Sequence, residues 1–279
     1  MQSNQSSSVD RQRKNRLLAA LCLAMIGLFI LMGFAARGRG VQGVSKMKLS
    51  VEDPRPVAEA ILELERKYGR VITYEDPRYV HDSDVADVTL KVARDLDKYK
   101  PGEGPKVLVP KGGTLEFTYE VMADTNLPAD PVMVVQKLLD AQSARGNGGR
   151  FRLETSGQII HVIPTAIKNG AGELVHQESA LDTIISLPAG ERTVLQKLEN
   201  ICAAISRATN IRVEFGTIPT GLFLRHRDQE GVTSERARDV LVKTLEAMNN
   251  ETGLSWRLLY GPGTKRYSLN IHRVSKRNG

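Results

Sequence analysis

The sequence contains few of the residue types that catalytic, metal-binding and nucleic-acid-binding proteins concentrate. Only two of its 279 residues are cysteines, Cys22 and Cys202. They lie in unrelated segments, so we expect no disulfide between them and no zinc site built on cysteine. Aromatic residues make up 5% of the chain, which is few for a surface that stacks bases. Glycine and proline do not dominate either, which excludes a collagenous or broadly disordered chain.

Motifs of the common enzyme classes are also missing. We find no Gly-x-Ser-x-Gly elbow, no His-Glu-x-x-His motif and no Gly-x-x-x-x-Gly-Lys phosphate loop. Cys202 could be a nucleophile beside a histidine, but it shares an apolar helical stripe with Leu198 and Ile205. A small buried side chain is the better interpretation of Cys202. We therefore predict a protein that is not an enzyme and that needs no cofactor.

One cluster has metal-like composition: His81, Asp82, Asp84 and Asp87. A calcium loop that began at Asp82 would need glycine at its sixth position and glutamate at its twelfth, and these positions hold Asp87 and Ala93. A solvated loop is the simpler interpretation, so we predict no metal site.

The positive charge is confined to the N-terminal end. The first 48 residues contain eight basic residues and one acidic residue, and the rest contain 31 of each, so the whole excess of +7 lies at that end. Charge in this position is typical of membrane topology, whereas a nucleic-acid-binding protein usually carries a basic folded domain. We expect no nucleic-acid partner.

Residues 17–36, LLAALCLAMIGLFILMGFAA, form an uncharged apolar run. A helix of this length spans roughly 30 Å, which is the thickness of a bilayer core. Four basic residues precede the run, so residues 1–16 are expected to be a disordered cytoplasmic tail and the rest to lie outside the cytoplasm. We predict a single-pass inner-membrane anchor, with a cleaved signal peptide and release into the periplasm as the alternative.

The rest of the chain shows one order of elements twice. Residues 47–51, a helix that ends near Gly69, and residues 70–74 are repeated as residues 183–187, an apolar helical stripe capped by Asn210, and residues 211–215. Within this part, Tyr74 and Phe215 correspond at an offset of 141 residues.

The order then continues in both copies with a strand, a helix and a hairpin. In the first copy these are residues 114–121, a helix opened by Asp130 and a hairpin over 151–163. In the second copy we expect a strand at 222–224, a helix capped by Ser234 and a hairpin over 256–272. Phe-Arg-Leu at 151–153 matches Trp-Arg-Leu at 256–258, at an offset of 105.

The predicted fold class is α+β: an N-terminal transmembrane helix followed by two duplicated β-α-β-β-α-β-β units. We place the first unit at 45–168 with an insertion at 76–112, a linker at 169–180 and the second unit at 181–275. A single fused domain is the alternative.

One stretch resembles a known module. Residues 237–259, ARDVLVKTLEAMNNETGLSWRLL, are similar to the short N-terminal domain of secretins and TonB-dependent receptors, which has a helix followed by a Thr-Gly-Leu turn and an aromatic strand. The matching residues are Ala237, Leu241, Leu245, Thr252, Gly253, Leu254 and Trp256. The first copy has Gly148-Gly149-Arg150 where that turn should be. The resemblance implies a non-enzymatic periplasmic docking module.

Two groups of residues are candidates for a partner surface. The first is Tyr74, Glu75, Asp76, Arg78 and Tyr79, because tyrosine and arginine are favoured anchors at interfaces. The second is a basic group made of Arg225, His226 and Arg227. Ordinary turn chemistry and a charged strand edge are the alternatives.

These observations favour a non-catalytic, membrane-anchored extracytoplasmic protein. It would bind an envelope protein or form a homo-oligomer, and the addition of strands at sheet edges is one way to do so. The alternative is an envelope hydrolase or a ligand-binding protein whose site the sequence does not reveal.

Overall fold

The computed structural model describes residues 43–92, 106–146, 148–248 and 253–275. The predicted anchor at 17–36 lies outside these residues. None of the described helices combines the length and the apolar composition that a membrane-spanning helix needs. A small unit contains residues 43–44 and 122–126, in which the Ala123 N–H donates to the Gly43 carbonyl. The remaining described residues form the main unit.

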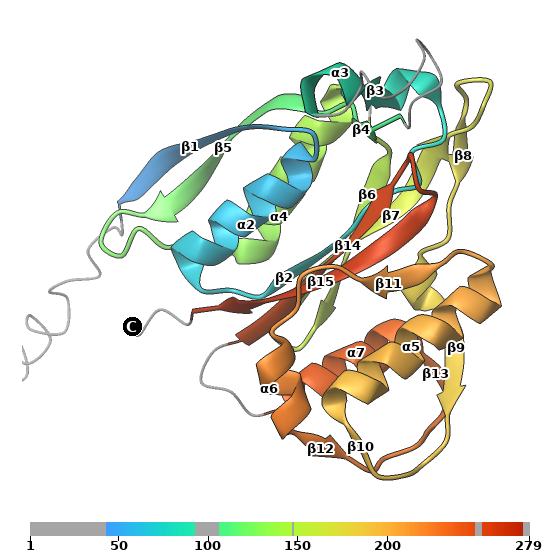
Figure 1. The fold of residues 1–279 in the computed structure, drawn as a ribbon. Coiled ribbons are helices and arrows are strands. Elements are labelled where there is room, and N and C mark those ends of the chain that lie inside the picture. The colour runs from blue at the N-terminus through green and yellow to red at the C-terminus, as the bar shows by residue number, and fades with distance from the viewer. Residues whose placement is uncertain (1–42, 93–105, 147, 249–252, 276–279) are drawn as a thin grey trace, which may run out of the picture. The chain divides into compact units, whose positions relative to one another are not determined.

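The α+β class is confirmed (Figure 1). The elements up to residue 168, here called the first half, are β1 (Val44–Asp53), α2 (Pro56–Tyr68), β2 (Ile72–Glu75), η1 (Asp82–Asp84), β3 (Val85–Asp87), α3 (Thr89–Val92), β4 (Leu108–Pro110), β5 (Gly113–Met122), α4 (Pro131–Ala144), β6 (Arg150–Ser156) and β7 (Ile159–Lys168).

The predicted linker contains structure of its own, because β8 (Leu174–His176) pairs with the end of β7. The elements that follow it, here called the second half, are η3 (Ala180–Asp182), β9 (Ile184–Leu187), β10 (Arg192–Thr193), α5 (Val194–Thr209), β11 (Val213–Phe215), α6 (Thr220–Arg225), β12 (Arg227–Asp228), β13 (Val232–Arg236), α7 (Ala237–Glu246), β14 (Gly253–Gly261) and β15 (Arg266–Val274).

One seven-stranded sheet contains strands from both halves. Its order is β11-β15-β14-β2-β7-β6, with β8 joined to β7. The centre is a parallel pair between β14 and β2, in which Arg257 lies opposite Tyr74 and Leu258 opposite Glu75. Strands that are far apart in the sequence therefore lie side by side in the middle of the sheet, where Figure 1 draws β2 and β14 next to each other.

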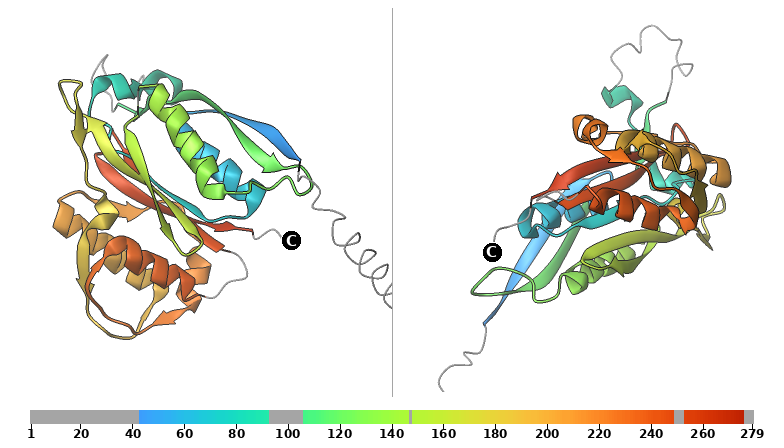
Figure 2. Two further views of the ribbon diagram at one scale, coloured as in Figure 1. Left: turned by 180° about the vertical axis from the view of Figure 1, so that it is seen from behind. Right: turned by 90° about the horizontal axis from the view of Figure 1, so that it is seen from below.

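Each half covers a different face of this sheet. The first-half core joins α2 and α4 to Ile72 and Val162 of the sheet and to alternate residues of β5. The second-half core joins α5 and α7 to Trp256, Leu258 and Leu269. Because neighbouring residues of a strand point to opposite faces, one helix pair covers each face (Figure 2).

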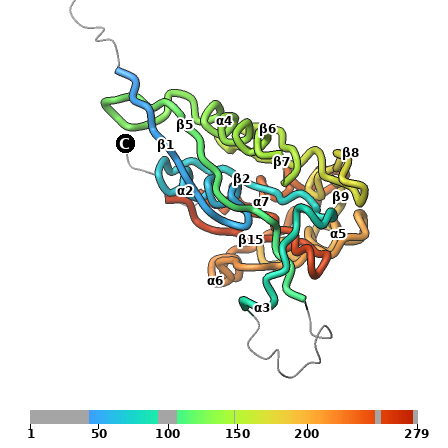
Figure 3. The backbone as a smooth tube through the Cα atoms, turned by 90° about the horizontal axis from the view of Figure 1, so that it is seen from above, coloured from blue at the N-terminus to red at the C-terminus, as the bar shows by residue number. Residues whose placement is uncertain are grey.

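A two-stranded ribbon lies on the outer side of each helix pair. β1 pairs with β5 in the first half, as Figure 3 shows, and β9 pairs with β13 in the second. In β5, Leu115, Phe117 and Tyr119 are buried and alternate with exposed residues, which is the pattern of a strand with one buried face.

Helix ends follow the local sequence in most places. Asp130 caps α4, with its carboxylate accepting from the Val132 N–H at 2.9 Å. Thr193 and Gln196 form a reciprocal capping box at the start of α5. Asn210 ends α5 in the left-handed conformation, as predicted, and Gly69 ends α2 in the same way.

Two predicted elements of the second half are wrong. Residues 222–224, expected as a strand, lie in helix α6, which begins directly after Pro219. Phe223 of this helix is fully buried. Ser234, expected as a helix cap, lies within strand β13, and α7 begins three residues later. In both places the residue pattern was too short to separate a helix from a strand.

The packing predicts a large contrast between two leucines. Leu198 of α5 is fully buried, whereas Leu224 of α6 is 51% exposed. We expect Leu198→Ala to lower the free energy of unfolding by about 2–5 kcal/mol, because it leaves a cavity in the second-half core. Leu224→Ala should change it by less than about 0.5 kcal/mol. Urea unfolding of both variants checks this, and equal effects would contradict the assigned core.

Candidate functional site

The first predicted partner surface lies in the interior. Tyr74, Glu75 and Asp76 are at most 1% exposed, and Tyr79 is also buried. Arg78 is half-buried, and its backbone N–H donates to the Gln177 side chain at 2.8 Å. The expectation of an accessible surface at these residues is corrected by their position: they occupy β2, which is a central strand, and the chain immediately after it.

Asp76 is the centre of a saturated polar network. Its carboxylate accepts from Arg55 Nε at 2.6 Å, from the Tyr74 hydroxyl at 2.8 Å and from the Tyr79 hydroxyl at 3.1 Å. It also accepts from the backbone N–H of Tyr260 at 2.9 Å. Burial and the nearby Asp76 charge raise the pKa of both tyrosines well above the usual value. These hydroxyls are therefore donors to Asp76 at neutral pH and not proton acceptors.

Glu75 points to the other face of the sheet and meets Arg238 of α7. Arg238 is fully buried and donates to Glu75, to Ser179 at 2.9 Å and to Asp182 at 3.0 Å. The Ser179 hydroxyl also donates to Glu75. Burial raises the pKa of Glu75, while the Arg238 charge acts in the opposite direction. The two acids of the predicted surface thus hold the halves together at the β14–β2 joint.

Two histidines belong to the same joint. His161 of β7 is fully buried, contacts Thr73 Oγ1 at 2.7 Å and stacks on Trp256 with ring centroids 5.5 Å apart. Burial, followed by the Arg238 charge, lowers the pKa of His161 to about 4. His272 of β15 contacts Glu65 of α2 at 2.7 Å, which adds a second link between the halves.

The basic group lies elsewhere. Arg225 and Arg227 are exposed and His226 is half-buried, at the end of α6 and the start of β12. The His226 ring contacts the Leu222 carbonyl at 3.0 Å. This group and residues 74–79, which lie in and after the central strand β2 of the main sheet, therefore do not form one surface.

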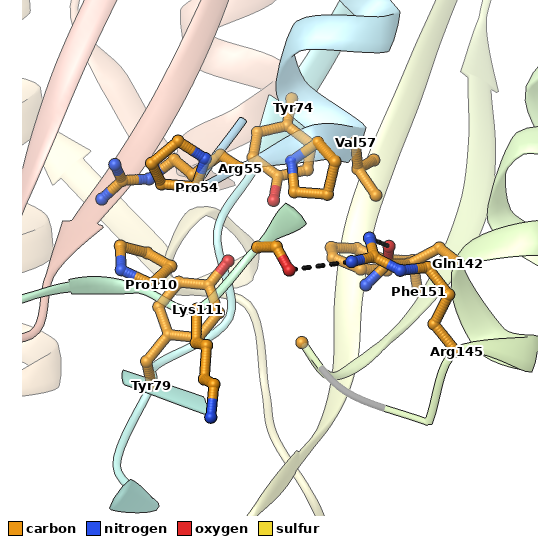
Figure 4. A pocket seen from close by; sticks show the side chains of 13 residues that line it. Pro54, Arg55, Val57, Tyr74, Tyr79, Pro110, Lys111, Gln142, Arg145 and Phe151 are labelled. Atoms are coloured by element: carbon orange, nitrogen blue, oxygen red, sulfur yellow. Dashed lines mark hydrogen bonds between the residues drawn. The ribbon is translucent and has the colours of Figure 1, made fainter. Parts of the chain in front are cut away.

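Two of the hollows among the described residues are a small cavity and an open depression. One cavity of about 10 Å³ has room for roughly one water molecule. Its wall includes Tyr74, Tyr79 and Phe151, and Figure 4 shows Arg145 at its side, where the guanidinium donates to the Gly112 carbonyl at 2.8 Å. An open depression at Glu191, Gln196 and neighbouring residues is the other.

Local hydrogen bonds account for the metal-like cluster. His81 accepts from the Ser83 N–H, Asp87 caps the turn at Thr89, and Asp84 pairs with Lys168 at 3.2 Å. Asp82 begins the short helix η1. In the part of the chain that the structure describes, no three His, Cys, Asp or Glu residues are placed to hold a metal ion.

Cys202 is buried in α5, and burial raises the pKa of its thiol to about 12. Thiolate is the nucleophilic form of cysteine, so this side chain has little of it at neutral pH.

Comparisons with family models, with curated proteins and with solved structures found no match to this chain. The resemblance of residues 237–259 to the secretin module therefore stays a prediction.

Two of the outer edges of the main sheet, those of β6 and β11, were not included in the predicted site. Among the described strands, none pairs with the outer side of β6 or of β11. A two-residue turn joins Ser156 to Ile159, so hydrogen-bonded pairs alternate along the hairpin from that point. Leu153 and Thr155 therefore direct their backbone N–H and C=O groups away from β7, and the Thr155 side chain is exposed.

The outer edge of β11 is shorter. The Tyr267 N–H donates to the Arg212 carbonyl at 2.8 Å, and the Gly216 N–H donates to Leu269 at 3.0 Å. The residues between them, Val213 and Phe215, therefore face outward, and the outward N–H of Val213 donates to Ser206 Oγ at 2.8 Å. One sequence signal pointed to these edges, the match between Phe-Arg-Leu at 151–153 and Trp-Arg-Leu at 256–258. It makes β6, an outer strand, the counterpart of β14, a central strand.

Removing the charge of Asp76 should be costly. Asp76→Asn leaves the largely buried Arg55 guanidinium without its carboxylate, so we expect a loss of about 3–5 kcal/mol in the free energy of unfolding. Glu116→Gln, which breaks the exposed Lys48–Glu116 pair of 2.7 Å, is the control and should leave the urea midpoint unchanged. Equal midpoints for the two variants would contradict the role of Asp76.

The low pKa of His161 predicts acid sensitivity. The folded-state value is about 4, whereas an exposed histidine has 6.5, so the unfolded chain binds a proton first as the pH falls. Stability from this group is complete above pH 6.5 and decreases towards pH 4, by up to about 3 kcal/mol. We expect His161→Gln to make the slope of unfolding free energy against pH smaller by up to one proton in this range. Identical slopes in urea titrations of both proteins would refute this.

Proposed function

We propose that the protein is a non-catalytic, membrane-anchored extracytoplasmic module of the envelope, and that it binds a protein partner or assembles through the edges of its main sheet. The observation that carries the proposal is the pair of outer strands β6 and β11, whose outward backbone groups have no strand partner among the described residues. An exposed strand edge is a template for another strand, and backbone hydrogen bonds supply the affinity.

The state of the buried acids supports a non-catalytic role. A general acid or base needs a pocket in which substrate reaches its proton. Asp76 instead accepts four hydrogen bonds at distances up to 3.1 Å, and Glu75 is shared between Arg238 and Ser179. These residues work as internal supports of the sheet.

The anchor at residues 17–36 remains part of the proposal. Its length, its lack of charge and the basic residues before it support insertion with the folded part outside the cytoplasm. An edge-binding module held at a membrane meets its partners at raised local concentration, so modest affinity suffices.

The duplication is likewise proposed, and pairing in the two halves supports it. β2 is parallel to β7 and β6 antiparallel to it, while β11 is parallel to β15 and β14 antiparallel to it. One detail repeats at side-chain level. The Ile72 N–H donates to Glu65 at 2.9 Å and the Val213 N–H donates to Ser206 at 2.8 Å, and both pairs differ by 141 positions.

The test uses the full chain captured from membranes in mild detergent. Thr155→Pro removes an outward N–H from β6 without removing a bond to β7, and proline is tolerated at such edge positions. We expect the parent to recover one defined envelope protein or a second copy, and Thr155→Pro to lower that recovery about tenfold.

Thr155→Val is the matched control, since it keeps the N–H and should recover the partner like the parent. Partner recovery is measured by quantitative mass spectrometry of the captured material. An extract in which the parent is monomeric with nothing attached would count against the binding role. Undiminished recovery by Thr155→Pro would count against the β6 edge.

A further inference from the structure

We propose that the partner at these edges is a second copy of the same chain, with β6 of one copy paired in parallel with β11 of the next. The inference rests on the proposed binding role and specifies its partner and register. It follows from a comparison of the internal β14–β2 joint with the two outer strands.

The internal joint shows how the pairing is made. β14 and β2 are parallel, with Leu258 opposite Glu75. Beyond that pair, the Asp76 N–H donates to the Leu258 carbonyl at 2.8 Å, and the Tyr260 N–H donates to the Asp76 carboxylate at 2.9 Å. The joint is thus a small set of hydrogen bonds between one strand of each half, some between backbone groups and one to the Asp76 carboxylate.

The outer strands are the counterparts of the two strands in this joint. β6 and β14 are each the first strand of a terminal hairpin, and β2 and β11 each follow a first helix and run parallel to the hairpin's second strand. With the offsets of 105 and 141, the pair Arg257–Tyr74 becomes Arg152 of one copy opposite Phe215 of the next.

Strand direction permits this addition. Across the sheet, β11 and β15 run one way, β14, β2 and β7 run the other way, and β6 returns to the direction of β11. The next copy therefore continues the strand directions, is displaced by six strands, roughly 29 Å, and is rotated by the twist that accumulates over them, roughly 120–150°.

Helix placement permits it as well. Helices α2 and α4 cover one face at β6, while α5 and α7 cover the opposite face at β11. Within one chain, the face covered by helices changes from one side of the sheet to the other at the β14–β2 joint. Two copies joined at β6 and β11 would repeat this change of face at their contact. Because the contact joins two different surfaces, it repeats from copy to copy, into a ring if the rotation between copies closes and into an open chain if it does not.

The Asn270 side chain accepts a backbone N–H that the proposed contact between copies would use. The Thr217 N–H, counterpart of the Asp76 N–H, donates to Asn270 Oδ1 at 2.8 Å within the chain. In the joined state, that N–H would donate to the Leu153 carbonyl of the next copy. Asn270 therefore competes with association, as charged or capped edges do in other sheets.

Cysteine cross-linking of the full chain tests the register. One protein carries Arg152→Cys and a second carries Phe215→Cys, both with Cys22→Ala and Cys202→Ala, and a thiol cross-linker of about 8 Å joins positions that lie opposite each other. We expect a cross-linked dimer in the mixture and none from either protein alone, because like edges do not pair.

Ser156→Cys is the matched control for Arg152→Cys. It lies on the same face of β6 but four residues along, about 13 Å away, and should give at least tenfold less product with Phe215→Cys. Equal products from both positions, or none from either while the chain is shown to be folded, would overturn the inference.

Asn270→Ala provides a gain-of-function readout. Freeing the Thr217 N–H should tighten self-association by roughly two- to tenfold, measured by analytical ultracentrifugation of the full chain in detergent. Unchanged or weaker association of a folded variant would contradict the proposed edge. A monomeric chain that still captures a different envelope protein through Thr155 would overturn only this inference and leave the proposed function standing.

Discussion

The parallel pairing of β14 with β2 is the constraint on which the rest of the structure depends. It places two acidic residues, Glu75 at the end of β2 and Asp76 directly after it, in the middle of a sheet, where an unpaired carboxylate would be unfavourable. Asp76 and Glu75 are tolerated there because Tyr260 and Arg238, both from the other half, donate to them. The buried charges therefore depend on the pairing that brings their donors to them.

The same joint explains why one sheet can carry two separate cores. Each core needs a helix pair on one face of three strands, and the joint turns the second set over relative to the first. Neither helix pair has to share space with the other. The duplication that we propose would in this way yield one layered body while leaving one strand of each half at an outer edge.

Local patterns in the sequence were sufficient for many elements. Asp130, Asn210 and the glycine turn after Ser156 mark real boundaries, because capping and turn chemistry act over a few residues. The short segment at 222–224 was mispredicted because a three-residue apolar run fits either element. Burial of Tyr74 to Tyr79 could not be foreseen, since it arises from strands far along the chain. The same applies to Arg238, which looks like a surface residue of an amphipathic helix until its partner Glu75 is known.

The wide separation of the joint's partners has a consequence for how the chain matures. Tyr260 and Asp76 are 184 positions apart, so the middle of the sheet can form only after the chain has been made as far as Tyr260. Contacts of such span carry a large loop-closure entropy and form late. If the folded part is exported, β2 lies outside the cytoplasm without its partner strand, and its acids stay hydrated, until the β14–β15 hairpin has also been exported. Quality-control proteases would meet the molecule in that interval.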